Sequence, residues 1–196
     1  MKKLLCVLMA AVFAVIGLAG CSKSDEGEST PTGSNVRVTM QDGGSFVIEL
    51  YEQYAPETCK NFLKLVDEGF YDGLTFHRIM DGFMAQGGSS DGKGIEGSDE
   101  TIKGEFSANG FTQNTLSHTR GVVSMARAND YNSASSQFFI CYDDCSFLDG
   151  EYAAFGKVIE GMEVVDAFLD VERTYNSSGE LASPVEPIVI KTMEII

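Results

Sequence analysis

Short apolar segments, many of them alternating with polar residues, recur along most of the chain, whereas helical periodicity is confined to two places. Alternation of period two is typical of strands with one buried face, and glycines or polar clusters separate these segments. The strands predicted in this way cover residues 36–40, 46–50, 74–80, 83–86, 121–126, 137–142, 153–159 and 187–196. Because strands do not alternate regularly with long helices, we predict a mostly β, antiparallel barrel or sandwich.

Two helices are predicted between these strands. Pro56 suits the first position of a helix and Gly69 suits its end. The apolar face of this helix, at a spacing of 3.6 residues, consists of Cys59, Phe62, Leu63 and Val66. A second, short helix is predicted over residues 161–169. Residues 89–115 and 172–183 are predicted to be loops, and the first is long enough to be functional or to be held by its own contacts.

The N-terminus has the features of an export signal. Lys2 and Lys3 precede an apolar run over residues 4–18, which is short for a membrane span of about 20 residues. The run leads into Leu-Ala-Gly-Cys, ending at Cys21, which is similar to the lipobox of bacterial lipoproteins. The resemblance implies that residues 1–20 are a removable signal peptide and that Cys21 is lipidated. An ordinary signal peptide or an uncleaved anchor is the alternative.

The segment after the predicted leader has the composition of a linker. Residues 21–34 are rich in Ser, Thr, Gly and acidic residues, and after Cys21 their only apolar side chain is a proline. Such a segment is expected to be a flexible, solvated tether. Residues 35–196 are then the predicted globular domain, which is long enough to bury a core. We expect an exported protein, anchored by lipid to the cell membrane or the outer membrane, with its domain outside the cytoplasm.

The charge of the chain restricts its partners. The formal net charge is −15, and loss of the leader with its two lysines would lower it to −17. Binding of nucleic acid needs a basic surface, so this class of partner is not expected. Adsorption to an anionic lipid surface is not expected for the same reason, which leaves the lipid on Cys21 as the membrane contact.

Cysteine and histidine usage gives no sign of a metal site. Of the five cysteines, Cys59, Cys141 and Cys145 would remain unmodified in the exported protein. Three is an odd number, so at least one thiol has no partner within the chain, while a Cys141–Cys145 bridge and three free thiols both remain open. The two histidines, His77 and His118, are too far apart in sequence for a familiar metal-binding signature. We expect both histidines to be structural, His77 through hydrogen bonds, and no metal or cofactor.

One cation stands out within the predicted strands. By strict alternation over residues 74–80, Arg78 shares a face with Leu74, Phe76 and Met80. A guanidinium among apolar side chains is costly unless it has a partner or a task. A structural ion pair is the simpler explanation. The alternative is an apolar groove with one fixed donor, suited to a neutral substrate.

Further motifs favour the second explanation. They follow in the order Phe-His-Arg-Ile (76–79), Gly-Phe-Met-x-Gln-Gly-Gly (82–88), Ser-Met-Ala (124–126), Ser-Gln-Phe-Phe-Ile (136–140) and Leu-Asp-Gly-x-x-x-x-Phe-Gly-Lys-Val (148–158). In this order and with compatible gaps they closely resemble the cyclophilin family of peptidyl-prolyl cis/trans isomerases, over roughly residues 36–196. The resemblance implies an eight-stranded antiparallel closed β-barrel capped by two α-helices, with a substrate groove on the outside of the barrel.

The resemblance also assigns roles to residues. It implies that Arg78 is the catalytic arginine and that Gln86 and Gln137 assist it. The implied proline pocket consists of Phe83, Met84, Phe139 and Leu148. Ala126 and Gln137 match positions that bind the substrate backbone. Three further positions on the implied substrate surface differ from common family residues, where many members have asparagine, tryptophan and histidine; they are Arg127, Phe147 and Tyr152.

The implied reaction suits these residue types. Rotation about an X–Pro bond is slow because amide resonance sets a barrier of about 18–20 kcal/mol. In the twisted state the prolyl nitrogen gains a lone pair, to which a guanidinium can donate. No bond is broken, so neither a nucleophile nor a cofactor is needed. We expect a monomer that acts on proline-containing polypeptides and assists folding of exported proteins.

Two other functions are alternatives to isomerisation. The first is a binding module that holds prolyl peptides, as a holdase or adhesin, without turnover; the combination of Arg78 and Gln137 favours catalysis over it. The second is a serine hydrolase built on Ser135 or Ser136 with His77. The sequence lacks a Gly-x-Ser-x-Gly elbow, and isomerisation accounts for more residues.

Overall fold

The computed structural model describes residues 33–196. The predicted signal peptide, Cys21 and all but the last two residues of the predicted linker lie outside the described residues. Within the described range, no helix is both long enough and apolar enough to cross a membrane.

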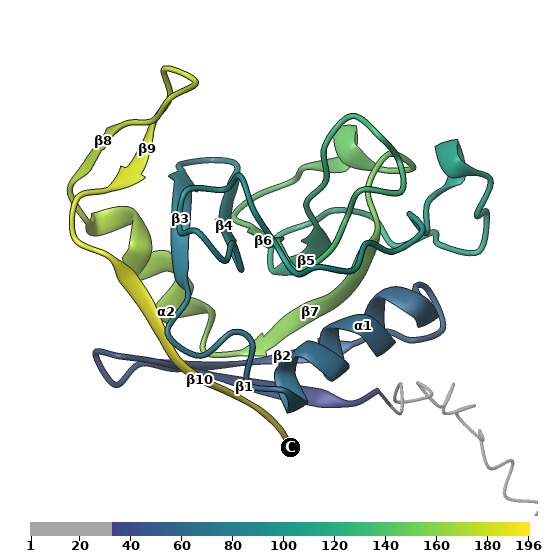
Figure 1. The fold of residues 1–196 in the computed structure, drawn as a ribbon, viewed down its shortest axis with the longest axis horizontal. Helices are drawn as coiled ribbons and strands as arrows, with labels where there is room; N and C mark the ends of the chain where they lie inside the picture. The colour runs from purple at the N-terminus through teal and green to yellow at the C-terminus, as the bar shows by residue number, and fades with distance from the viewer. Residues whose placement is uncertain (1–32) are drawn as a thin grey trace, which may run out of the picture. The chain divides into compact units, whose positions relative to one another are not determined.

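Eight strands form one closed barrel, in the spatial order β1-β10-β3-β4-β6-β5-β7-β2 (Figure 1). Every neighbouring pair in this ring is antiparallel. The barrel strands are β1 (Asn35–Met40), β2 (Ser45–Leu50), β3 (Thr75–Met80), β4 (Met84–Gly87), β5 (Val122–Met125), β6 (Phe138–Cys141), β7 (Ala154–Glu160) and β10 (Ile188–Ile195). The predicted eight-stranded antiparallel barrel is therefore confirmed. Closure leaves no barrel strand with an unpaired edge.

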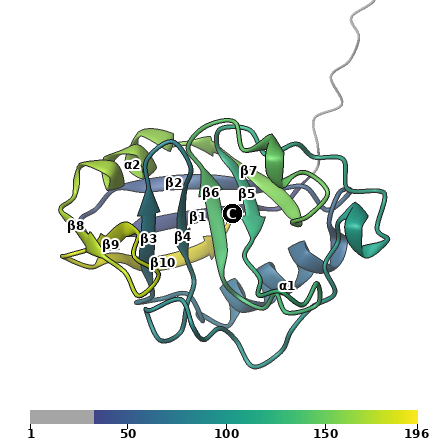
Figure 2. The same ribbon diagram turned by 90° about the horizontal axis from the view of Figure 1, so that it is seen from above.

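Two helices lie on opposite sides of the barrel (Figures 1 and 2): α1 (Pro56–Asp67) and α2 (Met162–Asp166). A 3₁₀ turn, Ala167–Asp170, directly follows α2. Helix α1 begins at the predicted proline. Its apolar face differs slightly from the prediction, because Leu65 is buried and Leu63 is only half-buried. The buried face of α1 is thus rotated toward Leu65.

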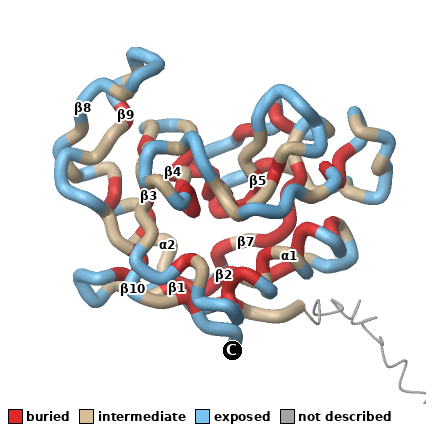
Figure 3. Tube along the Cα trace, viewed as in Figure 1, coloured by how far each residue is buried: buried red, intermediate tan, exposed pale blue. Residues whose placement is uncertain are grey.

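Aromatic rings fill the barrel interior. Phe62 enters it from α1, with ring centroids 5.6 Å from Phe138 and 5.1 Å from Phe155. Tyr71 lies beside it at 5.2 Å, and its hydroxyl donates to the carbonyl of Ser136. Figure 3 shows the buried residues concentrated on the strands and α1, with the exposed residues on the loops. The interior is therefore a packed core, and a substrate groove has to lie on the outside.

Strand β3 contains a β-bulge that the sequence pattern did not predict. Phe76 pairs with Gly87 and Arg78 pairs with Gln86, so His77 is one extra residue on β3. As a result Phe76 and Ile79 are both fully buried in the core, although they are three residues apart. Arg78 therefore does not share a face with Phe76, and the prediction of strict alternation was wrong at this point. The bulge turns Arg78 to the outer face of the barrel.

The predicted loop over residues 172–183 is in fact a hairpin. Strands β8 (Arg173–Tyr175) and β9 (Leu181–Pro184) form a separate two-stranded sheet. In Figure 1 this hairpin projects beside β3, and β9 contacts β3. The turn uses Asn176 and Gly179, and Gly179 has a left-handed φ of 78° that favours glycine. The sequence pattern did not indicate these strands, because they are polar and only Ala182 of the hairpin is fully buried.

The long loop over residues 89–115 is fixed by hydrogen bonds to α1. Glu105 is only 3% exposed, and its carboxylate accepts the backbone N–H groups of Glu57 and Thr58 at 3.1 and 2.8 Å. The Thr58 hydroxyl donates to the same carboxylate at 2.7 Å. These N–H groups belong to the first turn of α1, which lacks a side-chain cap of its own. A carboxylate distant in sequence therefore caps the helix, and its negative charge interacts favourably with the helix dipole.

Replacing Glu105 should destabilise the domain measurably. Glu105→Ala leaves buried donors at the start of α1 without an acceptor, so we expect the free energy of unfolding to fall by about 2–4 kcal/mol. Urea unfolding followed by circular dichroism measures this change. Glu100→Ala is the matched control in the same loop, because Glu100 pairs only with Lys64 at the surface; it should leave the midpoint unchanged. Equal midpoints for Glu105→Ala and wild type would refute the capping role.

Candidate active site

The predicted site residues gather on the outer face of β3, β4, β6 and β5, which lie side by side (Figure 2). A hollow of about 130 Å³ lies there. It is lined by Arg78, Phe83, Met84, Gln86, Ala126, Arg127, Phe139, Leu148 and Tyr152. Gln137 adjoins the hollow through a hydrogen bond from Gln86, and Phe147 packs on Phe83 with ring centroids 5.7 Å apart. The structure thus brings together every predicted site residue of the domain.

The floor of this hollow is a small apolar cluster, separate from the barrel core. Its buried members are Met84, Phe139, Cys141, Cys145 and Leu148. Pairing between β4 and β6 places Met84 opposite Cys141. Phe138 and Ile140, which alternate with Phe139 along β6, point into the barrel and are fully buried. Alternation along β6 therefore separates the core side chains from those of the hollow.

The guanidinium of Arg78 has three neighbours at the rim of the hollow. Nε and Nη2 donate to the two carboxylate oxygens of Glu180, at 2.8 and 2.6 Å. Nη1 donates to Oε1 of Gln86 at 3.3 Å, as expected from the sequence. Cζ lies 5.9 Å from the ring centroid of Phe83, over its face, a cation–π contact. The sequence pattern does not predict Glu180, because the hairpin that carries it has the polar composition of a loop.

A chain of hydrogen bonds continues from Arg78 along the groove. Because Gln86 Oε1 accepts from Arg78, its Nε2 is free to donate, and it does so to Gln137 Oε1 at 3.0 Å. Gln137 Nε2 then donates to the backbone carbonyl of Glu96 at 3.1 Å. Arg78 carries donors only, so it fixes the orientation of both amides. The polar groups along the groove are thereby ordered before any ligand arrives.

Gln86 lies where three hollows meet. Besides the apolar hollow, it lines one of about 200 Å³ that reaches Ser133 and Ser135. It also lines one of about 400 Å³ that extends to the β8–β9 hairpin and includes Glu180. An extended peptide could thus continue in either direction from the apolar hollow.

The guanidinium of Arg127 is occupied by contacts with other residues of the protein. Nε and Nη2 donate to the carbonyl of Glu151 at 3.1 and 2.9 Å, and Nη1 donates to the carbonyl of Ala128 at 2.9 Å. Its Cζ lies 4.5 Å from the ring centroid of Tyr152 and 4.8 Å from that of Tyr131. Tyr152 in turn meets Phe139 edge to face at 6.0 Å. Arg127 therefore braces the wall of the hollow and keeps Tyr152 against Phe139.

His118 packs behind Phe139, on the side away from the hollow. The fully buried ring stacks on Phe139 with centroids 6.0 Å apart; Nδ1 lies 2.8 Å from an Asp149 carboxylate oxygen and Nε2 lies 2.9 Å from the Ser124 hydroxyl. Burial lowers the pKa of His118 and outweighs the opposing effect of Asp149. Partial burial alone would raise the pKa of Asp149, but hydrogen bonds from Ser117 and His118 lower it. His118 is thus a structural histidine, as predicted, and its burial favours the neutral ring. Its contact with Asp149 fixes the turn that carries Leu148.

The three thiols are also buried, whereas the other histidine, His77, is half-buried with its ring nitrogens enclosed. Neither ring nitrogen of His77 has a hydrogen-bond partner among the described residues, so the expected hydrogen bonds are not found. Cys59, Cys141 and Cys145 are free thiols. Burial raises the pKa of Cys59 to about 12 and also raises those of Cys141 and Cys145. These cysteines are therefore inert, apolar packing groups at neutral pH.

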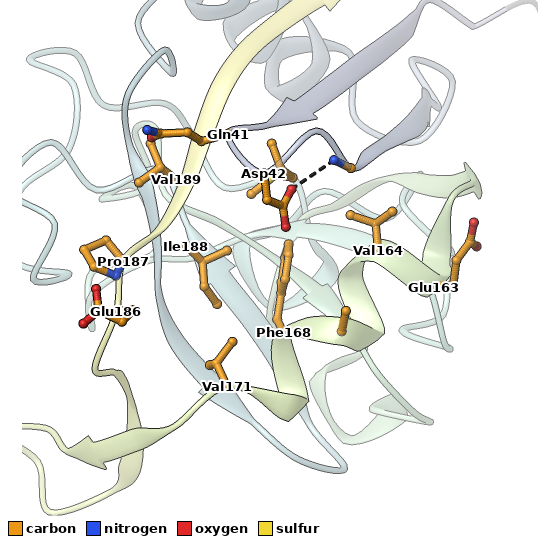
Figure 4. Close-up of a pocket in the computed structure, with 13 residues that line it drawn as sticks. Gln41, Asp42, Glu163, Val164, Phe168, Val171, Glu186, Pro187, Ile188 and Val189 are labelled. Carbon is orange, nitrogen blue, oxygen red and sulfur yellow. Dashed lines mark hydrogen bonds between the residues drawn. The ribbon is translucent and has the colours of Figure 1, made fainter.

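A larger hollow, of about 720 Å³, lies away from Arg78 (Figure 4). Val164, Phe168 and Ile188 form part of its apolar lining, while Glu163 and Glu186 add carboxylates. It contains none of the predicted site residues and no cation. Within residues 33–196, no three His, Cys, Asp or Glu side chains are grouped as metal ligands would be.

Known proteins are similar to this chain in sequence and in fold. Residues 35–195 match the family described as cyclophilin type peptidyl-prolyl cis-trans isomerase/CLD. Peptidyl-prolyl cis-trans isomerase A of Dickeya dadantii is 40% identical over 196 residues, which covers 96% of this chain and 97% of that protein. Peptidyl-prolyl cis-trans isomerase B of Bacillus subtilis is 45% identical over 124 residues, covering 63% of this chain and 82% of that protein.

Solved structures agree with the sequence comparisons. A cyclophilin type peptidyl-prolyl cis-trans isomerase of Cryptosporidium parvum superposes with a TM-score of 0.73 at 32% identity, covering 84% of this chain and 98% of that chain. A crystal structure of the same protein in the presence of the dipeptide Ala-Pro gives a TM-score of 0.72 at 32% identity, covering 83% and 98% of the two chains.

The buried state of His118 predicts a dependence of stability on pH. Its pKa is lowered in the folded protein, so only the unfolded chain takes up a proton as pH falls through about 6.5. Stability should therefore be full above that pH and decrease below it. We expect His118→Asn to remove about 1 kcal/mol of the stability lost between pH 7.5 and 5.5. Urea unfolding at both pH values measures this difference.

The comparison between wild type and His118→Asn isolates the contribution of His118 to the pH dependence of stability. Burial also lowers the pKa of His77, but this contribution is present in both proteins and cancels. If the wild type instead gained stability at pH 5.5 relative to His118→Asn, His118 would be charged beside Asp149 and the assignment of a neutral ring would be wrong.

Proposed function

Since this chain belongs to the cyclophilin family of peptidyl-prolyl cis/trans isomerases, we propose that it accelerates X–Pro isomerisation in exported proteins and assists their folding at the cell envelope. The observation that carries the assignment of the site is a guanidinium held at the rim of a small apolar hollow. Arg78 supplies the cation, and Phe83, Met84, Phe139 and Leu148 supply the apolar surface. The substrate is a proline-containing polypeptide, bound by a single copy of the chain.

The hollow suits a prolyl ring because it is small and because Phe83, Met84, Phe139 and Leu148 present an apolar surface to the ring. Burial of the ring against Met84 and Phe139 excludes water from the adjoining peptide bond. The crystal structure of the Cryptosporidium parvum relative was determined in the presence of Ala-Pro, a dipeptide of the kind proposed here as substrate. With the ring held, the preceding carbonyl can rotate while the proline stays in place.

Arg78 is proposed to act on the bond that twists. As conjugation is lost, the prolyl nitrogen gains a lone pair to which a guanidinium N–H can donate. This donation is weak toward the planar amide, so it favours the twisted state selectively. Each 1.4 kcal/mol of such selective stabilisation is worth about tenfold in rate. Gln86 orients the guanidinium, while Gln137 and Ala126 are proposed to bind the substrate backbone.

The location of the enzyme rests on the N-terminal sequence. The signal-like residues 1–20, the lipobox-like ending at Cys21 and the polar residues 22–34 together support a lipid-anchored domain on a tether. The formal charge of −15 supports an anchor that does not depend on adsorption to anionic lipid.

The role of Arg78 predicts a selective loss of rate. Arg78→Ala should lower kcat/KM for an Ala-Pro peptide by about 100-fold or more, because the transition-state donor is lost. Binding of the same peptide, measured by NMR titration, should weaken by no more than about threefold, because the apolar hollow remains. Arg37→Ala, at an exposed arginine of β1, is the control and should retain the wild-type rate. An Arg78→Ala variant with an unchanged rate would contradict the proposed mechanism.

The role of Cys21 predicts where the protein is found in cells. Cys21→Ser removes the thiol that would be acylated, so the variant should lose its lipid and leave the membrane fraction of bacteria that express the full chain. Cell fractionation with immunoblotting measures the partition. Cys6→Ser, a change within the predicted signal peptide, should leave the protein in the membrane fraction. Retention of Cys21→Ser in that fraction would refute lipid anchoring through this residue.

A further inference from the structure

The most specific polar contact in the site is the one between Arg78 and Glu180. The two residues are 102 positions apart in sequence, yet both carboxylate oxygens accept hydrogen bonds from one guanidinium, at 2.8 and 2.6 Å. A bidentate pair of this kind restricts both the position and the plane of the arginine. The family motifs described above end at residue 158, before the hairpin that carries Glu180.

The β8–β9 hairpin holds Glu180 in place at both its backbone and its side chain. The Asn176 side chain donates to Glu180 Oε2 at 2.8 Å and accepts from the Glu180 backbone N–H at 2.9 Å. The backbone N–H of Asn176 donates to the carbonyl of Glu180 at 2.9 Å. At the base of the hairpin, Ala182 is fully buried and Arg173 donates to the carbonyl of Ile79 at 3.4 Å. The carboxylate is therefore fixed relative to β3 and to Arg78.

The pattern of donors leaves part of the guanidinium free. Of the five N–H donors of an arginine side chain, Glu180 accepts two and Gln86 accepts one. The remaining two belong to Nη1 and Nη2, at the end of the planar group. Glu180 thus occupies the Nε edge and leaves the terminal N–H groups for a ligand in the adjoining hollow.

Glu180 has two opposing effects on Arg78. Its hydrogen bonds from Arg78 and Asn176 lower its pKa, so the carboxylate is charged at neutral pH and partly offsets the arginine charge. It also fixes a long side chain that would otherwise sample many rotamers. The two side chains are 28% and 30% exposed, so water screens the long-range part of the field. Donation to the substrate nitrogen is a short-range contact that depends on geometry, and orientation therefore outweighs charge neutralisation.

We propose that Glu180 is a positioning residue, which holds the guanidinium of Arg78 in the orientation required for catalysis. This inference rests on the proposed role of Arg78 and extends it to a carboxylate supplied by the β8–β9 hairpin. Glu180 contacts no reacting atom and acts only through Arg78. Its removal should therefore affect turnover more than peptide binding.

The test measures kcat and KM for an Ala-Pro tetrapeptide, with the full-length chain purified in detergent. Glu180→Ala should lower kcat about tenfold and change KM less than about twofold, because a mobile guanidinium reaches the reactive orientation less often. Glu180→Gln, which has the size of the native side chain but only one acceptor oxygen, should also lower kcat. Glu172→Ala is the control, an exposed glutamate that precedes β8, and should retain wild-type kcat.

Two further measurements separate positioning from a general structural role. In the Arg78→Ala background, Glu180→Ala should cause no further loss of rate, because there is no guanidinium left to position. In heteronuclear NMR spectra, the Arg78 Nε–H resonance should be shifted from that of a free arginine in the wild type and move toward it in Glu180→Ala. Circular dichroism verifies that each variant is folded; if Glu180→Ala is not, Glu180→Gln provides the comparison.

Three results would overturn the proposal. They are an unchanged kcat in both folded Glu180 variants, an increase in kcat/KM, and an equal further loss in the Arg78→Ala background. An increase would show that the carboxylate competes with substrate for Arg78. The failures of the two proposals differ: a fully active Arg78→Ala rejects the role of Arg78 itself, whereas an inactive Arg78→Ala beside fully active Glu180 variants rejects only the role of Glu180.

Discussion

The β-bulge at His77 is the constraint on which the rest of the site depends. With one extra residue on β3, Phe76 and Ile79 both enter the barrel core and Arg78 faces outward. Without the bulge, the strand would place Arg78 on the same side as Phe76, where a guanidinium would be costly to bury. The core therefore anchors β3 on both sides of the arginine, and the groove gains a cation without a charge inside the barrel.

The polar side chains of the groove and the apolar floor of the hollow are held in place by different contacts. One hydrogen-bonded chain runs from Glu180 through Arg78 and Gln86 to Gln137, and each member fixes the orientation of the next. The apolar floor is fixed by β4 and β6, and His118 supports it by stacking on Phe139. Preorganised donors beside an apolar surface need little rearrangement during the reaction. This arrangement suits a reaction in which no bond is broken and only the geometry of an amide changes.

Much of the fold and the apolar part of the site could be predicted from the sequence. Alternation located the barrel strands, and the ordered motifs brought Arg78 and Gln86 together with the proline pocket. Two features were missed for physical reasons. Alternation assumes a regular strand, so it could not detect the bulge at His77. The β8–β9 hairpin is polar because it packs on the barrel with little more than Ala182, so its strands carry no apolar pattern, although the Asn-Ser-Ser-Gly turn between them is typical of hairpins. The contact between Glu180 of this hairpin and Arg78 joins residues 102 positions apart, so no local sequence pattern indicates it.

The central claim is that the guanidinium of Arg78 acts on the twisted amide and contributes little to binding the planar one. Exchange NMR on a prolyl peptide at saturating protein measures the two separately, since chemical-shift changes report binding and exchange cross-peaks report rotation of the bound peptide. For wild type we expect both signals. For Arg78→Ala we expect the binding shifts to remain and the exchange between bound cis and trans forms to disappear. Exchange at the wild-type rate in a fully bound Arg78→Ala complex would contradict the account.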